Sequence, residues 1–430
     1  MWKRTRSRHW PMKFSSTTAE KNCFERAVPD RIQESQMKLN RLLLLLVAIC
    51  SGVTVRAELA SLFTNVAPAV ALADRPSIIV IQCHGLARGD LSCYGQTNFQ
   101  TPNLDRLAAD GIRFTHYTGG ADSAATTAAL LAEKNAATGE PNLAQRLQQE
   151  GYHTGLIGEW SLGGQPWTRG FDEFVGFLDD AEAQNYFPAT LWRYAPDSII
   201  DPVSNRLSAF VGREMLYPNS GGKKGQYLPE LFVSAMNNFV RVNQPDAANH
   251  YRPFFLLVNL PAPRTATTGA DDFPVPSDAP FTDEPWPQAA KNRAALVTRL
   301  DDSIGRMLEQ LGKFQRTNNI AIFFTASTAP EKFANQQLNF LLPAGDFRDA
   351  KNVQPTPLPM IAWWPGKIPA GRISKMPWSA TDFTPTALGM ARVKPTAGLT
   401  GISVLPNLYG EPGTNSPTLQ DRPILMDRMF

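Results

Sequence analysis

Polar side chains that could do chemistry follow directly after three apolar runs of this chain. They are His84 after 77–82, Glu159 and Ser161 after 153–157, and Ser327 and Thr328 after 320–324. An imidazole or a carboxylate can act as a base or bind a metal, whereas a hydroxyl is a poor nucleophile unless a base or a metal activates it. These positions are therefore the first candidates for a site, provided that the fold brings them together.

Each candidate also has a simpler, structural interpretation. A metal site needs three or four ligands, and His84 has no obvious companions, so a hydrogen-bonded histidine is the simpler interpretation. Ser123 follows Asp122 and could attack a substrate, but a serine at the start of a helix is first of all a capping residue. Arg264 and Lys134 are either solvated charges or the cations of an anion-binding site.

The composition is that of a globular protein, and its charge gives no reason to expect a nucleic-acid partner. Of the 430 residues, 43% are hydrophobic and 19% are charged. The formal net charge of +3 arises at the N-terminus, where residues 1–57 hold 11 Lys and Arg against 4 Asp and Glu. The remainder holds 31 against 35, a net charge of −4, which does not favour binding to nucleic acid.

A secretory signal peptide is predicted at residues 37–57. Two cations precede the apolar run 42–50, and small residues then lead to Ala57. The run is shorter than the about 20 residues that cross a bilayer, so we expect no transmembrane span in the mature chain and an exported protein, periplasmic or extracellular. Residues 1–36 would then be an extension upstream of the true start at Met37. The alternative is a signal anchor with a short cytoplasmic tail.

Strands and helices alternate after about residue 74. Buried strands are predicted at 77–82, 153–157, 254–258, 320–324 and 360–363, and helices at 102–109, 143–150 and 296–311. The segment 264–288 is rich in Pro, Asp and Thr and is expected to be a long surface loop. This alternation predicts an α/β fold with a mostly parallel sheet covered on both faces, and ligands at the carboxyl ends of its strands.

Several ordered segments of the chain carry a recognisable pattern. The clearest are RPSIIVIQCHGLARGDLSCYGQ, TPNLDRLAADGIRFTHY, GYHTGLIGEWSLGG, RGFDEFVGFL, VTRLDDSIGRMLEQL and WWPGKIPAG. In their order and spacing these segments resemble the type I sulfatases of the alkaline phosphatase superfamily. The resemblance implies an alkaline-phosphatase-like α/β/α sandwich over residues 74–410. The family adds a smaller C-terminal domain, whereas only the short remnant 411–430 follows here, so we expect that subdomain to be truncated.

The resemblance also implies where catalysis would occur, and the key residues are replaced. Sulfatases attack sulfur with a formylglycine made from the cysteine of a C-x-P-x-R motif, held beside a calcium ion. The nucleophile position is Ser123 here, and Thr127 stands where the motif has arginine. The positions of the calcium ligands are His84, Gly85, Ser327 and Thr328. None of them is a carboxylate, so we expect no calcium and no other cofactor.

The cationic side chains of the family's site are changed as well. Glu159 replaces a lysine, and Ser161 and Arg264 replace histidines. Arg348 stands near the position of a further lysine, and Lys134 keeps the family's cation.

These replacements predict a sulfatase-family protein that does not hydrolyse sulfate esters. We expect it to bind a sulfated glycan or another sulfated small molecule, or to act as the partner of an active relative. The alternative is an active sulfatase or other ester hydrolase rebuilt around Ser123, His84 or Cys83, which needs a base within hydrogen-bond distance. No base stands at a recognisable spacing, and Cys83 and Cys93 are expected to be core residues.

Overall fold

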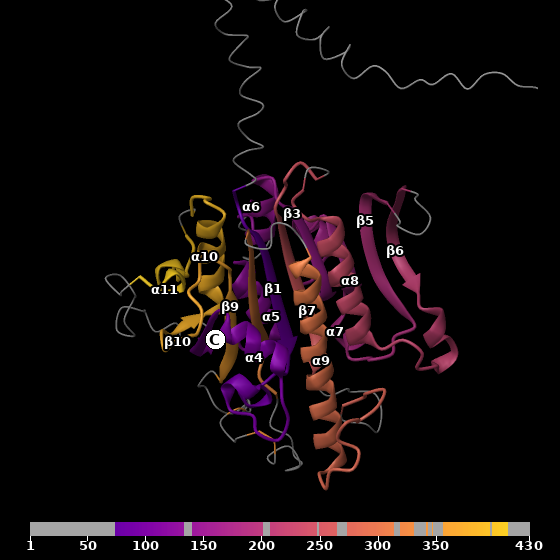
Figure 1. Ribbon diagram of the computed structural model, residues 1–430. Coiled ribbons are helices and arrows are strands. Elements are labelled where there is room, and N and C mark those ends of the chain that lie inside the picture. Colours follow the sequence, from indigo (N-terminus) through magenta and orange to yellow (C-terminus); the bar gives the residue numbers. More distant parts are fainter. Residues whose placement is uncertain are drawn as a thin grey trace, which may run out of the picture. The chain divides into compact units, whose positions relative to one another are not determined.

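The computed structural model describes residues 74–132, 140–200, 207–246, 249–264, 273–313, 319–330, 341–342, 346, 356–395 and 398–411 (Figure 1). The predicted signal peptide at 37–57 and the remnant from 412 onward lie outside these residues. Within the described ranges, no helix has both the length and the apolar character needed to cross a bilayer.

The described strands form one 11-stranded sheet in the order β10-β2-β9-β8-β1-β7-β3-β4-β5-β6, with β11 paired to β2. In chain order they are β1 (Ser77–His84), β2 (Ile112–Thr118), β3 (His153–Glu159), β4 (Glu173–Phe177), β5 (Thr190–Ile200), β6 (Leu207–Met215), β7 (Phe254–Pro263), β8 (Ile320–Thr328), β9 (Pro357–Trp363), β10 (Arg372–Ser374) and β11 (Trp378–Ser379). The central strands β8, β1, β7, β3 and β4 all run parallel to their neighbours in this group.

Helices pack on this sheet in two sets. The bounds are α4 (Pro102–Ala109), α5 (Ser123–Leu131), α6 (Leu143–Gln149), α7 (Asp180–Ala183), α8 (Leu228–Val242), α9 (Gln288–Gly312), α10 (Phe383–Met390) and α11 (Leu405–Tyr409). Helix α9 contacts α4 and α8, and α8 and α9 lie side by side over β7 (Figure 1). Helix α10 contacts α5 and α6, which pack on β8 and β3. The predicted α/β/α sandwich with a mostly parallel sheet is confirmed.

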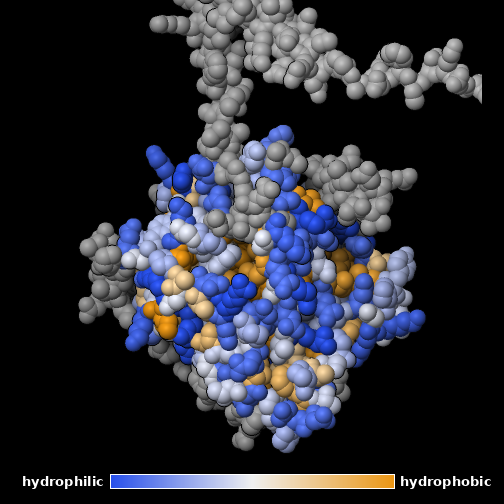
Figure 2. Space-filling model, viewed as in Figure 1, coloured by the Kyte–Doolittle hydropathy of each residue, from blue (hydrophilic) through white to orange (hydrophobic). Residues whose placement is uncertain are grey.

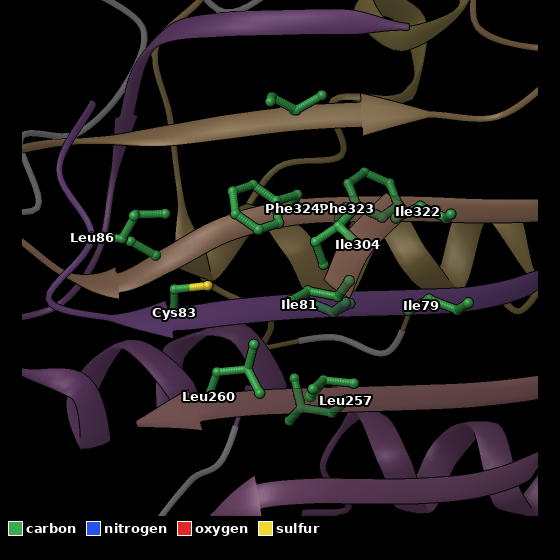
Figure 3. Packing of buried hydrophobic residues seen from close by; sticks show 14 of the residues in the cluster. Ile79, Ile81, Cys83, Leu86, Leu257, Leu260, Ile304, Ile322, Phe323 and Phe324 are labelled. Carbon is green, nitrogen blue, oxygen red and sulfur yellow. The ribbon is translucent and has the colours of Figure 1, made fainter. Parts of the chain in front are cut away.

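The elements that were predicted from continuous apolar runs are present, and most are longer than expected. Strand β1 is wholly buried as far as Cys83, and β8 is buried along its full length (Figure 3). Helix α9 begins at Gln288, directly after Pro287, rather than at the first apolar residue of its stripe. The described part of the expected surface loop, 273–287, contains no helix or strand.

The expectation for 360–363 needs a correction. This segment lies in β9, which is buried but pairs antiparallel with both β2 and β8, so it is not part of the parallel core. The short strands β10 and β11 follow it. A buried apolar run is compatible with either direction, so the sequence alone did not distinguish them.

One glycine allows β3 and β7 to approach each other closely near their carboxyl ends. Gly158 of β3 has a φ of 111°, and a Cβ at this position would lie 1.8 Å from the carbonyl oxygen of Asn259 on β7. Only glycine tolerates both this conformation and this contact. Outside the buried sheet, hydrophilic residues predominate on the face seen in Figure 2, with separate apolar areas between them.

Candidate functional site

Four ionisable side chains meet where the central strands end. His84 is the last residue of β1, Glu159 is the last residue of β3, and Arg264 directly follows β7. Asp180 begins the short helix α7, three residues after β4. The pairing of β1 with both neighbours shifts between Cys83 and His84, and such a bulge re-aims a side chain at the end of a strand. Parallel strands thus deliver these groups to one edge of the sheet.

The guanidinium of Arg264 stands among the other three side chains. Its Nη1 lies 2.7 Å from Oδ1 of Asp180, 3.0 Å from Nδ1 of His84 and 3.6 Å from Oε2 of Glu159. Its Nη2 donates to the backbone carbonyl of Asp180 at 2.8 Å. The Arg264 and Glu159 side chains are only 9% and 4% exposed. The structural interpretation of Arg264 as a solvated charge is therefore wrong.

Nδ1 of His84 faces two partners of opposite charge. It lies 3.0 Å from Nη1 of Arg264 and 3.4 Å from Oε2 of Glu159. A guanidinium only donates hydrogen bonds and a carboxylate only accepts them, so the tautomer of His84 decides which of the two contacts is a hydrogen bond. His84 is a hydrogen-bonded histidine, as its simpler interpretation predicted.

Electrostatics favour the ionised form of Asp180. Partial burial opposes its charge, but the hydrogen bond from Arg264 and the charge of that guanidinium outweigh this and lower the pKa to about 2. The cluster thus sets one guanidinium against two carboxyl groups. An incoming sulfate would meet no uncompensated cation among these four residues.

The positions that match the family's calcium ligands do not suit a hard cation. Gly85 has no side chain, and a Cβ there would lie 3.1 Å from Cα of Arg264. The hydroxyl of Ser327 accepts from Ser123 at 2.8 Å, and that of Thr328 donates to the carbonyl of Ala329 at 3.1 Å. Calcium takes 6–8 oxygen ligands, mostly anionic. An imidazole, a glycine and two engaged hydroxyls do not provide them.

A different trio could in principle hold a metal ion. His84, Glu159 and Asp180 each bring one ligand atom, and these atoms lie within 4.8 Å of one another. However, Nη1 of Arg264 already lies between them at hydrogen-bond distance of two of the three. The donor set therefore fits the guanidinium rather than a metal ion.

The candidate nucleophile Ser123 forms no hydrogen bond to a base in the part of the chain that the structure describes. It is the first residue of α5, and its Oγ donates to Oγ of Ser327, the one hydrogen-bond partner found in the described ranges. The expectation that Ser123 caps the helix is wrong, because Asp122 is the cap and accepts from the amide of Ala125 at 2.7 Å. Asp122 has the shorter reach to that amide, since the N-cap lies one residue before the helix.

The other site residues predicted from the sequence are not members of the Arg264 cluster. Thr127 is buried and donates to Oε1 of Gln82 on β1 at 3.3 Å. Ser161 is partly exposed, two residues beyond β3. Lys134 and Arg348 lie outside the described residues.

Cys83 and Cys93, the two cysteines among the described residues, are free and are not nucleophiles. Burial, assisted by the charge of Asp90, raises the pKa of the Cys83 thiol far above its usual range. Burial, assisted by the charge of Asp105, raises the pKa of Cys93 to about 12. Both thiols therefore stay protonated at neutral pH. Cys83 is a core residue, as expected, whereas Cys93 is only partly buried.

Two residues of this region were missed by sequence analysis. Asp180 sits just beyond a strand end, a signal that could have found it. Arg293 looks like a surface charge on the long helix α9, yet it is 0% exposed. Its guanidinium pairs with Asp90 at 2.6 Å and donates to the carbonyls of Pro263 and Gly85. It therefore joins the end of β7 to the loop that follows β1.

Fold and site together define a class of protein. An α/β/α sandwich whose polar groups gather at the carboxyl ends of its parallel strands is the architecture of the alkaline phosphatase superfamily. The family model described as Sulfatase matches residues 76–393, and this chain belongs to the sulfatase family.

Curated relatives and solved structures agree with this assignment. The chain is 28% identical to N-acetylgalactosamine-6-sulfatase of Canis lupus familiaris over 409 residues, which is 82% of this chain and 68% of the relative. It is 28% identical to arylsulfatase A of Bos taurus, covering 80% of this chain and 70% of the relative. It is also similar to the crystal structure of Ps i-CgsB in complex with k-i-k-neocarrahexaose, with a TM-score of 0.59, 25% identity and coverage of 78% and 76%.

Proposed function

We propose that this protein is a non-catalytic sulfatase homologue that binds a sulfated saccharide without hydrolysing it. One observation carries the proposal: a guanidinium stands among His84, Glu159 and Asp180, at the strand ends where a sulfatase holds its ion and its sulfate-binding cations. Relative to the family pattern, the lysine at 159 has become a carboxylate and the histidine at 264 has become an arginine. These two exchanges compensate each other and neutralise the arginine.

The nucleophile supports the same proposal. Oγ of Ser123 is hydrogen-bonded to another hydroxyl, and an unactivated hydroxyl is almost wholly protonated at neutral pH. Removing a nucleophile or its base alone costs on the order of a million-fold in turnover. In the alternative of a hydrolase rebuilt around Ser123, this serine has no hydrogen-bonded base among the described residues.

The ligand class follows from kinship. Curated relatives are named as sulfatases of N-acetylgalactosamine 6-sulfate, and a similar solved structure carries a neocarrahexaose. A retained saccharide-binding role therefore needs no new fold. We also propose that the protein is exported through the signal peptide at 37–57, in which case N-terminal sequencing of protein from its native host finds residues 1–57 absent.

A hydrolysis assay tests the central proposal. The secreted form, with added calcium, is incubated with 4-nitrophenyl sulfate beside a buffer blank, an active arylsulfatase A and the Ser123→Ala variant. We expect release at the blank rate, unchanged by calcium or by the substitution. Turnover above the blank that Ser123→Ala abolishes would instead support the rebuilt hydrolase.

A further inference from the structure

A surface pocket is connected by hydrogen bonds to the Arg264 cluster. It is a pocket of about 190 Å³ lined by residues 184–187, by 222–224 and by Pro274. Two hydrogen bonds connect its wall to the cluster: Nε2 of Gln184 donates to Oδ2 of Asp180 at 3.1 Å, and Oη of Tyr186 donates to the carbonyl of Arg264 at 2.6 Å. Two residues that line the pocket are therefore held by members of the cluster.

Its electrostatic character is opposite to that of the cluster. Lys223 and Lys224 are exposed, and neither forms an ion pair in the described part of the chain. No acidic residue is among those that line the pocket. Arg264, by contrast, is already compensated by Asp180 and Glu159. An anion that approaches this edge of the sheet would therefore be attracted to the two lysines rather than to the arginine.

The rest of the lining combines a ring surface with an amide. Phe187 packs on Tyr227, and Nζ of Lys224 lies 5.5 Å from the centroid of the Phe187 ring, which holds the ammonium above an aromatic face. Oδ1 of Asn185 accepts from the amide of Phe187 at 2.9 Å, so its NH₂ group is the polar end left toward solvent. Small-molecule sites combine apolar walls with a few well-placed polar groups in this way.

The walls are also fixed before any ligand arrives. Asn219 is 1% exposed, and its Nδ2 donates to the carbonyls of Pro188 and Gln226. Its Oδ1 accepts from the amides of Gly225 and Gln226. One buried side chain therefore ties the lysine loop to the segment that carries the aromatic residues. A pocket held in this way costs little entropy of ordering when it binds.

We propose that this pocket binds the acidic substituent of a saccharide, a sulfate or a carboxylate, through Lys223 and Lys224. The volume suits one such group with part of its ring rather than a long chain. The saccharide class rests on the proposed function, whereas the pocket and its preference for anions rest on geometry alone. The recess is thus a place for the charge of a ligand that the Arg264 cluster does not attract.

Binding measurements on the full chain test the proposal. The probes are N-acetylgalactosamine 6-sulfate, glucuronate and uncharged N-acetylgalactosamine, titrated at low and at high salt by calorimetry. We expect saturable binding of at least one acid, no binding of the neutral sugar, and weaker binding at high salt. The two acids separate sulfate from carboxylate as the preferred group.

Variants assign the binding to the pocket. Lys223→Gln with Lys224→Gln should weaken binding by about tenfold for each lysine, as expected for hydrogen bonds to a charged group. The matched control, Lys367→Gln with Lys375→Gln, removes two exposed lysines elsewhere and should bind like the wild type. Equal affinity of the pocket variant and the wild type, or no saturable binding of either acid, would overturn the proposal. Turnover of the sulfate ester would instead overturn only the non-catalytic assignment.

Discussion

At the scale of single residues, Arg264 determines the character of the strand ends. An arginine reaches three partners that a histidine in the same place would not reach together, and its fork donates to both the side chain and the backbone of Asp180. Glu159 is 4% exposed, and its Oε2 lies 3.6 Å from Nη1 of Arg264, so the two side chains form a largely buried ion pair. The pair is therefore expected to contribute to stability rather than to catalysis.

Removing the guanidinium of Arg264 should destabilise the protein. We expect Arg264→Met to lower the free energy of unfolding by about 3 kcal/mol, because a buried carboxylate is left without its cation. Adding Glu159→Gln should recover about half of the loss, since the orphaned charge is then gone. Urea denaturation of the two variants measures both effects. A single variant within about 0.5 kcal/mol of the wild type would contradict the role given to Arg264.

The lowered pKa of Asp180 predicts a dependence on pH. A carboxyl group whose folded pKa lies below its unfolded pKa of about 3.9 stabilises the fold above that value, and the contribution is lost as pH falls toward the folded pKa of about 2. Since the side chain is 52% exposed, we expect only about 1 kcal/mol. The difference in unfolding free energy between the wild type and Asp180→Asn should therefore shrink between pH 5 and pH 3. A difference that grows with acidity would refute the assignment.

Sequence reasoning identified most, though not all, of the members of this cluster. His84, Glu159 and Arg264 stand at strand ends in recognisable segments, so their meeting could be anticipated. Asp180 was missed because its strand, β4, is short and was not predicted. The capping role went to Asp122 rather than Ser123, a shift of one residue that propensity alone does not resolve.

At the scale of elements, the strands that carry the site were the easiest to predict. Runs such as 77–82 and 320–324 are apolar throughout because both faces of a central parallel strand are covered. The hairpin of β5 and β6 was not predicted, since β5 contains Pro196 and Asp197, residue types that are depleted in strands. Its pairing with β4 comes from the tertiary fold rather than from local preference.

Arg293 connects the end of β7 to the loop that follows β1. We expect Arg293→Met to lower the free energy of unfolding by about 3–5 kcal/mol, because Asp90 is 0% exposed and loses its only cation partner in the described ranges. The matched control is Arg306→Met on the same helix, whose side chain is exposed, and it should change stability by less than about 0.5 kcal/mol. Equal effects of the two substitutions, measured by thermal and urea unfolding, would contradict the structural role given to Arg293.

At the scale of the whole molecule, the chain has the sulfatase fold, and a guanidinium lies among an imidazole and two carboxyl groups at its strand ends. The chain is 25–28% identical to four of the curated sulfatases, and each match covers 77–82% of the chain. The fold was therefore predictable, since burial constrains many positions at once. The candidate site was harder to predict than the fold. It depends on a few side chains whose contacts, such as that of Arg264 with Asp180, cannot be read from the sequence.

The release of free sulfate from N-acetylgalactosamine 6-sulfate tests the central claim most directly. The protein and an active N-acetylgalactosamine-6-sulfatase are incubated in parallel with calcium, and sulfate is measured by ion chromatography over many hours. Because Ser123 forms no hydrogen bond to a base among the described residues, and a guanidinium lies among the strand-end carboxyl groups, we expect sulfate to stay at the level of the protein-free blank. Sulfate release in proportion to protein concentration, lost in the Ser123→Ala variant, would contradict the claim.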